Sequence, residues 1–371
     1  MSDHRLYIAA TGKHVGKTTD TLGLVAAINR SGVKVTYCKP VGQKFLDIQN
    51  LRVDKDTLLF AELIHFDLNP DLHSPVILGP GATTAYLDHP QKFPLKAKLL
   101  YAADQLSKDH ELVVFEGTGH PGVGSIADVS NAEVAKLVKA SVIMVVEGGI
   151  GSTIDELNMC LALFREKQVP ILGVIINKVL PEKIDKIKKY VGQKLQAMNL
   201  PLLGLIPYDR SLAYPLMKSV GDAINGVVQF NELNLDNIVE DIVAGSLIEL
   251  KELKSSNNIL LVVSIETLDK AIKKIEFFSK MLKMEHSPLS GIVTTGEGEI
   301  NSRCKAYIRR HGIPVVHTAL DTYGAVIKIS RIEVKINLQT PWKIKRAVEL
   351  IAENINLKPI LEKIKHQDTN L

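Results

Sequence analysis

The chain has 371 residues, which is more than one typical domain holds and predicts two or three domains. Hydrophobic residues make up 46% and charged residues 23% of the chain, as is typical of a soluble globular protein. The net charge of +4 gives no reason to expect nucleic acid as a partner. No apolar run is long enough to predict a membrane span, and three scattered cysteines exclude a disulfide framework, so we expect a cytoplasmic protein.

The first informative stretch runs from residue 5 to residue 19. Its apolar residues 6–10 predict a buried strand, and a helical pattern begins at Thr18. Between them lies a loop that ends in Gly16-Lys17-Thr18, the arrangement of a phosphate-binding loop, although the glycine expected at position 11 is a threonine. An ordinary strand-to-helix turn is the alternative. The candidate nucleotide-binding residues of this stretch are Thr11, Gly12, Lys13, His14, Val15, Gly16, Lys17, Thr18 and Thr19.

Further apolar strands alternate with amphipathic helices up to about residue 207. We predict strands at 33–38, 111–115, 141–146, 171–176 and 202–206, and helices at 132–139, 153–166 and 183–197. Residues 44–107 read as helical stretches separated by loops rich in proline and glycine. This alternation predicts an α/β fold with a doubly wound parallel sheet, whose ligand lies at the carboxyl ends of the strands.

The regular alternation of strands and helices ends after Pro207. An acidic helix is expected at 236–252, followed by strands at 259–263, 292–294 and 315–317 with helices at 267–284 and 300–311. These elements predict a second, smaller α/β unit, and a basic helical tail follows at 340–364. The expected domains are therefore 1–210, 211–335 and a C-terminal helical tail, 336–371.

Two carboxylates are candidates for binding Mg²⁺. Glu116 follows a predicted strand, so it is delivered to the ligand edge of the sheet, where phosphate-binding-loop enzymes hold the metal. The alternative is a solvated glutamate at a strand end. Asp56 is the second candidate, with Asp54 as its competitor and helix capping as another use for either. With the Thr18 hydroxyl, the predicted metal site comprises Thr18, Asp56 and Glu116.

Two lysines and one asparagine complete the predicted site. Lys39 ends the second strand, where a cation stabilises charge on a transferred phosphoryl or carboxyl group, and a surface lysine is the alternative. Lys17 and Lys39 are therefore the candidate catalytic residues. Asn177 closes a later strand, and its amide has the donor and acceptor groups that an adenine edge needs.

The first 210 residues resemble dethiobiotin synthetase and its relatives. The family loop is matched by Ala10-Thr11 through Val15-Gly16-Lys17-Thr18, and Lys39-Pro40-Val41 and Glu116-Gly117 match two further family motifs. The resemblance implies a homodimer that uses ATP and Mg²⁺, with Asp56 and Glu116 on the metal and Asn177 on adenine. The segments 122–131 and 147–155 resemble another branch, the N-terminal region of long phosphate acetyltransferases and relatives of cobyrinic acid a,c-diamide synthase.

The second unit resembles the DRTGG domain that follows that region, through Gly312-Ile-Pro-Val-Val316 and Asp321-Thr-Tyr323. Its name-giving motifs are degraded to Ser264-Ile-Glu-Thr267 and Thr295-Gly-Glu297. Two functions remain open: a nucleotide-binding ATPase or regulatory module that acts on a partner enzyme, and an ATP-dependent synthetase or ligase that acts on a small carboxylate.

Overall fold

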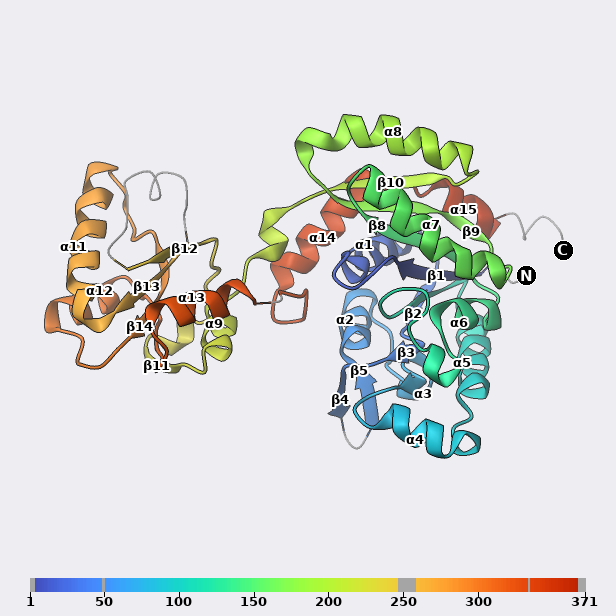
Figure 1. The fold of residues 1–371 in the computed structure, drawn as a ribbon, viewed down its shortest axis with the longest axis horizontal. Coiled ribbons are helices and arrows are strands. Elements are labelled where there is room, and N and C mark those ends of the chain that lie inside the picture. The colour runs from blue at the N-terminus through green and yellow to red at the C-terminus, as the bar shows by residue number, and fades with distance from the viewer. Residues whose placement is uncertain (1–3, 49–50, 246–257, 333, 366–371) are drawn as a thin grey trace. The chain divides into compact units, whose positions relative to one another are not determined.

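The structure is a computed structural model that describes residues 4–48, 51–245, 258–332 and 334–365 (Figure 1). It divides into two compact units. The first comprises Met1–Asp209 together with Ile336–Leu371, and the second comprises Arg210–Lys335. The chain therefore leaves the first unit once and returns to it, so the predicted C-terminal tail is part of the first unit.

A six-stranded parallel sheet forms the centre of the first unit, which confirms the predicted doubly wound α/β fold. Strand β1 lies between β7 and β8, with Ile8 beside Glu116 and Leu6 beside Ser141. The strand order reverses at β1, and a ligand crevice is expected at the carboxyl ends of the strands where this happens. Across the sheet the strands are β10 (Leu202–Pro207), β9 (Ile171–Val179), β8 (Ser141–Glu147), β1 (Arg5–Ala10), β7 (Leu112–Glu116) and β2 (Val35–Cys38).

Helices cover both faces of this sheet, and side chains alternate between them along β1. Tyr7 and Ala9 belong to a core shared with four helices, and this core is built from residues with less than a tenth of their surface exposed. Successive side chains of a strand point to opposite faces, so the buried Leu6 and Ile8 face the other side of the sheet, on which α1 (Lys17–Arg30) packs. The four helices of the first face are α5 (Leu95–Asp109), α6 (Asn131–Leu137), α7 (Gly151–Glu166) and α8 (Ile184–Ala197).

The returning segment forms α14 (Pro341–Asn354) and α15 (Lys358–Lys365), and α14 packs directly on α1. A Cβ atom at Gly23 of α1 would lie 2.3 Å from the Cβ atom of Ile351, so only glycine permits this approach of the two helices. After α14 the chain pairs with the edge strand β10, where Gly204 and Ile355 form an antiparallel bridge. Arg346 of α14 also forms an ion pair of 2.5 Å with Asp209, the last residue before the second unit.

Residues 44–107 contain strands as well as the expected helices. Val41–Gly42 (β3) pairs with Val76–Ile77 (β6), and Phe45–Ile48 (β4) forms a hairpin with Leu51–Asp54 (β5). The strands are only two to four residues long, too short to show an alternation that the sequence could reveal. The helices here are α2 (Lys55–Ile64), α3 (Pro70–His73) and α4 (Ala82–Asp88), followed by the start of α5.

The second unit has a five-stranded sheet in the order β11-β15-β14-β13-β12, and only β11 runs antiparallel. The strands predicted from residue 259 onward and the helices between them are present. The prediction of an acidic helix at 236–252 is wrong in the part that the structure describes, because Asp241–Ala244 is the strand β12. The β-branched pair Ile242-Val243 lies there beside β13, and pairing with a buried strand overrides helix propensity. Residues 246–257 of that prediction lie outside the described residues. The strands are β11 (Val227–Phe230), β13 (Ile259–Ser264), β14 (Leu289–Thr295) and β15 (Val315–His317), and the helices are α9 (Met217–Ala223), α11 (Ile265–Met281), α12 (Ser302–Arg310) and α13 (Thr322–Ser330).

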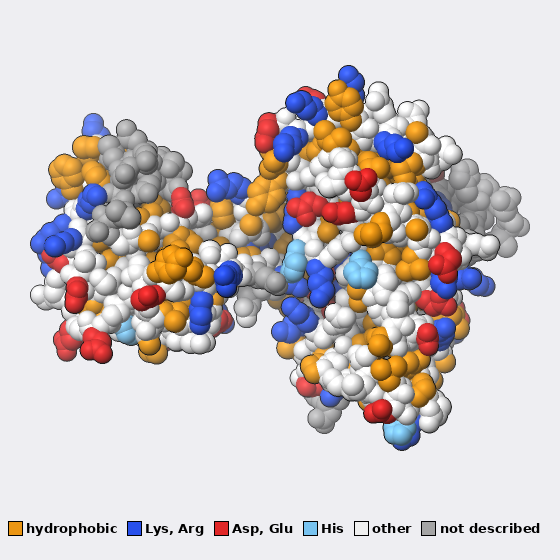
Figure 2. Space-filling view, in the orientation of Figure 1, with side chains coloured by type: hydrophobic (Ala, Val, Ile, Leu, Met, Phe, Trp, Pro, Cys, Tyr) orange, Lys and Arg blue, Asp and Glu red, His pale blue; other side chains and the backbone are white. Residues whose placement is uncertain are grey.

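Charged side chains of both signs are interspersed on the face of each unit that Figure 2 shows. This agrees with the small net charge of the chain. In the described part of the chain, no helix combines the length and the apolar character that crossing a membrane requires.

Candidate nucleotide-binding site

The loop between β1 and α1 presents the start of a helix whose backbone N–H groups are not capped by a side chain. Helix α1 begins at Lys17, and the preceding Gly16 has φ 99°, in the left-handed region that favours glycine. A Cβ atom at Gly16 would also lie 2.1 Å from the amide nitrogen of Asn177. Since a helix N-terminus carries partial positive charge, this loop has the geometry that receives an anion.

The carboxyl end of β9 holds the loop in this shape. The Nδ2 atom of Asn177 donates to the carbonyl of Val15 at 3.0 Å, and the Nζ atom of Lys178 donates to the carbonyl of His14. The Oδ1 atom of Asn177 accepts from the backbone N–H of Lys178 at 2.7 Å. The amide of Asn177 therefore stabilises the loop through the Val15 carbonyl. The expected contact of Asn177 with adenine stays a prediction.

Glu116 is the centre of the site. Its Oε1 atom accepts from three donors, the Nζ atom of Lys39 at 2.7 Å, the Oγ1 atom of Thr18 at 3.0 Å and the Nζ atom of Lys17 at 3.2 Å. Glu116 is the last residue of β7 and is completely buried, so a solvated strand-end glutamate is the wrong alternative. Lys39 is 4% exposed, and it is not a surface lysine.

The two aspartates near Lys39 have different positions. The Oδ1 atom of Asp54 accepts from the backbone N–H of Asp56 at 2.9 Å and caps α2, while the Oδ2 atom of Asp56 lies 2.9 Å from the Nζ atom of Lys39. Burial raises the pKa of the Asp54 carboxyl to about 6, against the opposing effect of Lys39. Asp56 is thus the carboxylate that joins the cluster of Glu116, and Asp54 shapes the helix that carries it.

Charges balance within this cluster of two lysines and two carboxylates. Burial acts to raise the pKa of Glu116, but Lys39 and Lys17 outweigh it and hold the pKa below the usual range. Burial acts to lower the pKa of Lys39, but Asp56 and Glu116 outweigh it and raise the pKa. For Lys17, burial dominates and the pKa is lowered. Lys39 is therefore the main partner of Glu116, and Lys17 is the more weakly held cation, with the longer contact.

The remaining predicted residues lie on the same loop at different depths. The hydroxyl of Thr11 is buried and donates to Glu156 of α7 at 3.4 Å, whereas Lys13 and His14 are exposed. Gly12 and Thr19 are half-buried. The exposed part of the loop therefore consists of Lys13 and His14.

Sequence reasoning missed Asn131, which holds the loop that follows Glu116. The Nδ2 atom of Asn131 donates to the carbonyls of Thr118 and His120, and its Oδ1 atom accepts from the Tyr7 hydroxyl at 2.9 Å. A Cβ atom at Gly117 would lie 2.6 Å from that oxygen. Asn131 is the first residue of α6, after the capping Ser130, whereas at the sequence level it was included only as the last residue of the segment 122–131.

A divalent cation fits the oxygen donors of the site. In the described residues, no group of three or more His, Cys, Asp or Glu side chains is placed to hold a metal by itself. Mg²⁺ does not need such a group, because it is usually bound by one or two carboxylates together with water and substrate phosphates. The carboxylates of Glu116 and Asp56 both contact the Nζ atom of Lys39, and the hydroxyl of Thr18 contacts Glu116 at 3.0 Å, so three hard oxygen donors lie close together.

Two comparisons with solved structures give distant similarity. The MinD cell division protein of Aquifex aeolicus matches with a TM-score of 0.38 and 15% identity, over 57% of this chain and 84% of that chain. The signal recognition particle receptor FtsY of Elizabethkingia anophelis, solved in complex with GDP, matches with a TM-score of 0.36 and 11% identity, over 54% of this chain and 56% of that chain.

Comparisons with known sequences are more informative. A family model described as an AAA domain matches residues 4–215. The phosphate acetyltransferase of Nitrosomonas europaea is 22% identical over 371 residues, covering 97% of this chain and 52% of that protein. The probable cobyric acid synthase of Methanocaldococcus jannaschii is 26% identical over 272 residues, covering 62% of this chain and 53% of that protein. The chain thus spans about half the length of these relatives.

Proposed function

This chain belongs to the AAA domain family, and from that premise we propose that its first unit binds ATP together with Mg²⁺. One observation carries the proposal: Lys17, Lys39 and Thr18 converge on the buried carboxylate of Glu116 at the start of α1. A phosphate chain received by the uncapped helix start would lie beside these groups.

Each side chain has a role that follows from its present contacts. The Nζ atom of Lys17, held at 3.2 Å by Glu116, would turn toward the phosphates and exchange one anion for another. Glu116, Asp56 and Thr18 would hold Mg²⁺, which neutralises phosphate charge when bound. Lys39 would remain at the carboxylates and add positive charge beside the transferred group.

Calorimetric titration with ATP and GTP in the presence of Mg²⁺ tests the proposal. Lys17→Ala should weaken ATP binding by about tenfold to a hundredfold, because a hydrogen bond to a charged group contributes about 1.5–3 kcal/mol. Lys188→Ala, on the exposed face of α8, is the matched control and should leave the affinity unchanged. Equal affinities of the Lys17→Ala variant and the unaltered protein would refute the proposed site.

We propose that the protein is an ATPase or a nucleotide-dependent regulatory module. An ATP-dependent synthetase is the second candidate. The burial of Lys39 favours the second, since a cation beside the phosphates would also stabilise an acceptor carboxylate. A phosphate-release assay with and without diaminopelargonate and bicarbonate separates the two. Substrate-stimulated release would establish a synthetase, and tight binding without stimulation would establish the regulatory module.

For the second unit we propose a DRTGG-like domain that reports the nucleotide state to a partner enzyme. The alignment with the phosphate acetyltransferase of N. europaea supports this, because it covers 97% of the chain and so includes both units. We further propose a cytoplasmic homodimer. Light scattering after size-exclusion chromatography tests the dimer, and a single mass near 40.8 kDa would contradict it.

A further inference from the structure

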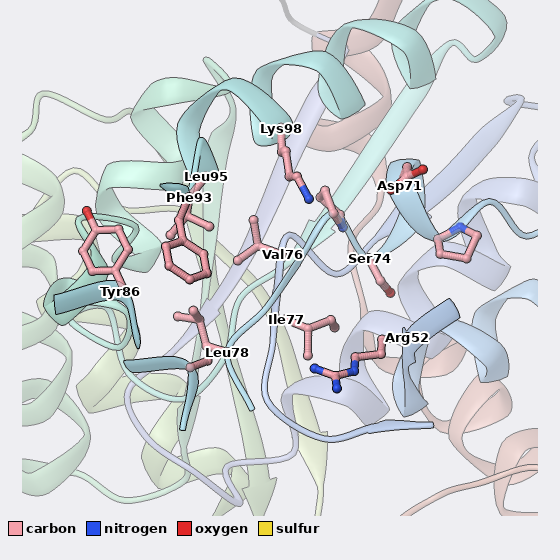
Figure 3. A pocket seen from close by; sticks show the side chains of 13 residues that line it. Arg52, Asp71, Ser74, Val76, Ile77, Leu78, Tyr86, Phe93, Leu95 and Lys98 are labelled. Atoms are coloured by element: carbon pink, nitrogen blue, oxygen red, sulfur yellow. The ribbon is translucent and has the colours of Figure 1, made fainter. Parts of the chain in front are cut away.

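A cavity of about 300 Å³ lies in the first unit beside the hairpin β4–β5 and the short helices α3 and α4 (Figure 3). Its lining includes no residue of the phosphate-binding loop and neither Lys39, Asp56 nor Glu116. The cavity is therefore separate from the proposed nucleotide site. It is lined by Arg52, Pro70, Asp71, Ser74, Pro75, Val76, Ile77, Leu78, Ala82, Tyr86, Phe93, Leu95 and Lys98.

One side of the cavity is apolar. Tyr86 and Phe93 have tilted rings with centroids 6.1 Å apart, and Leu78 and Leu95 lie close to them in Figure 3. The ring of Tyr86 is held in place because its hydroxyl donates to Asp128 at 3.2 Å. Aromatic and aliphatic walls of this kind bury the apolar body of a small molecule.

The charges on the lining are mainly positive. Lys98 and Arg52 enter from opposite sides of the cavity, whereas the Asp71 carboxylate points away from it (Figure 3). Lys98 is exposed, and across the described part of the chain its ammonium group makes no hydrogen bond and no ion pair. Arg52 pairs with Asp47 at 3.4 Å, but both side chains are more than half exposed, and such a pair is weak. The guanidinium of Arg52 also lies over the Phe45 ring, with its Cζ atom 4.8 Å from the ring centroid. The ammonium group of Lys98 is therefore the more available of the two cations.

We infer that this cavity binds a small organic anion with an apolar body, a monocarboxylate whose charged end lies between Lys98 and Arg52. The Ser74 hydroxyl on the lining is already bonded to the Thr57 hydroxyl at 2.8 Å and to the backbone N–H of Asp54 at 3.2 Å, so the two cations are the groups that select an anion. Water occupies about 30 Å³ per molecule in the liquid, so a cavity of this size has room for roughly ten non-hydrogen atoms. The apolar part of the ligand contacts Tyr86 and Phe93, and its carboxylate neutralises the unpaired charge of Lys98.

Three probes of nearly the same shape test the inference on the unaltered chain. They are 3-phenylpropionate, the neutral 3-phenylpropanamide and the cationic 3-phenylpropylamine, each titrated by calorimetry and by ligand-observed NMR. We expect saturable binding in the order anion, amide, amine. Equal binding of the three probes, tighter binding of the amine, or no saturable binding of the anion would overturn the inference.

Variants on one helix supply the second arm. Lys98→Met keeps the aliphatic stem, and it should weaken binding of 3-phenylpropionate about twofold to fivefold while leaving the amide unchanged, because Lys98 is exposed and an ion pair there contributes about 1 kcal/mol at most. Lys108→Met is the control, since Lys108 lies on the same helix outside the cavity. Lys17→Ala should bind the probe as the unaltered protein does, so loss of nucleotide binding and loss of anion binding are distinguishable. A Lys98→Met variant with undiminished preference for the anion would refute the assignment.

Discussion

Replacing Glu116 by glutamine should destabilise the first unit by about 3–5 kcal/mol. The substitution keeps the shape of the side chain but removes the charge that balances Lys17 and Lys39, leaving the cluster with Asp56 as its remaining carboxylate. Glu116 is completely buried and Lys39 is 4% exposed, so water cannot compensate for the lost charge. Removing one partner of a buried ion pair costs about this much.

The chain offers both a probe and a control for this prediction. Its single tryptophan, Trp342, lies on α14, so tryptophan fluorescence during urea unfolding reports on the first unit alone. Glu133→Gln is the control, because Glu133 pairs with Lys96 and Lys167 at the surface, at 3.7 and 3.3 Å, and such pairs contribute less than about 1 kcal/mol. If both substitutions lower the free energy of unfolding equally, the balanced buried cluster is not what stabilises the site.

Inorganic pyrophosphate extends the same experiment to function. An anion at the start of α1 would replace the charge that Glu116→Gln removes, and a ligand stabilises the folded state that binds it. Pyrophosphate should therefore raise the unfolding midpoint of Glu116→Gln more than that of the unaltered protein. An equal or smaller effect would show that the anion does not reach Lys17 and Lys39.

Two further predictions concern packing and pH. Gly23→Ala should destabilise the first unit by about 1–3 kcal/mol, because the clash with Ile351 outweighs the higher helix propensity of alanine. Gly192→Ala on α8 places its new methyl group in open space and should stabilise the unit by about 1 kcal/mol. Changes of the same sign in urea unfolding would contradict the role of helix contact. Burial lowers the pKa of His73 to about 4, so protonation favours the unfolded chain, and stability should fall by at most about 3 kcal/mol between pH 6.5 and 4. His73→Gln should lose this part of the pH dependence, and an unchanged profile would show that another group causes it.

The elements that the sequence predicted best are those buried on both faces. Strands such as Ser141–Glu147 are continuous apolar runs because helices cover the sheet from both sides. The loop ending in Gly16-Lys17-Thr18 was also predictable, because its residue types and their order are typical of a phosphate-binding loop. The position of Glu116 followed from the strand before it. What could be predicted was thus local, a strand and the polar residue at its end.

Contacts between distant segments were not predictable in the same way. Asp241–Ala244 lies in an acidic stretch with helical spacing, and only the neighbouring strand β13 makes it a strand. The amide of Asn177 suited a base, and the structure shows it bound to the Val15 carbonyl, which the sequence could not place beside it. Gly23 lowers the helix propensity of α1, and the reason for a glycine there is the close contact with Ile351, which lies more than three hundred residues later in the chain.

The return of the chain to the first unit has a consequence for the order of folding during synthesis. The surface of α1 that carries Gly23 stays uncovered until α14 has left the ribosome, after all of the second unit has been made. The edge of β10 likewise waits for Ile355. Domains usually fold as they emerge, the N-terminal one first. Here the second unit can complete its fold while the first is still open, and the half that carries the phosphate-binding loop closes last.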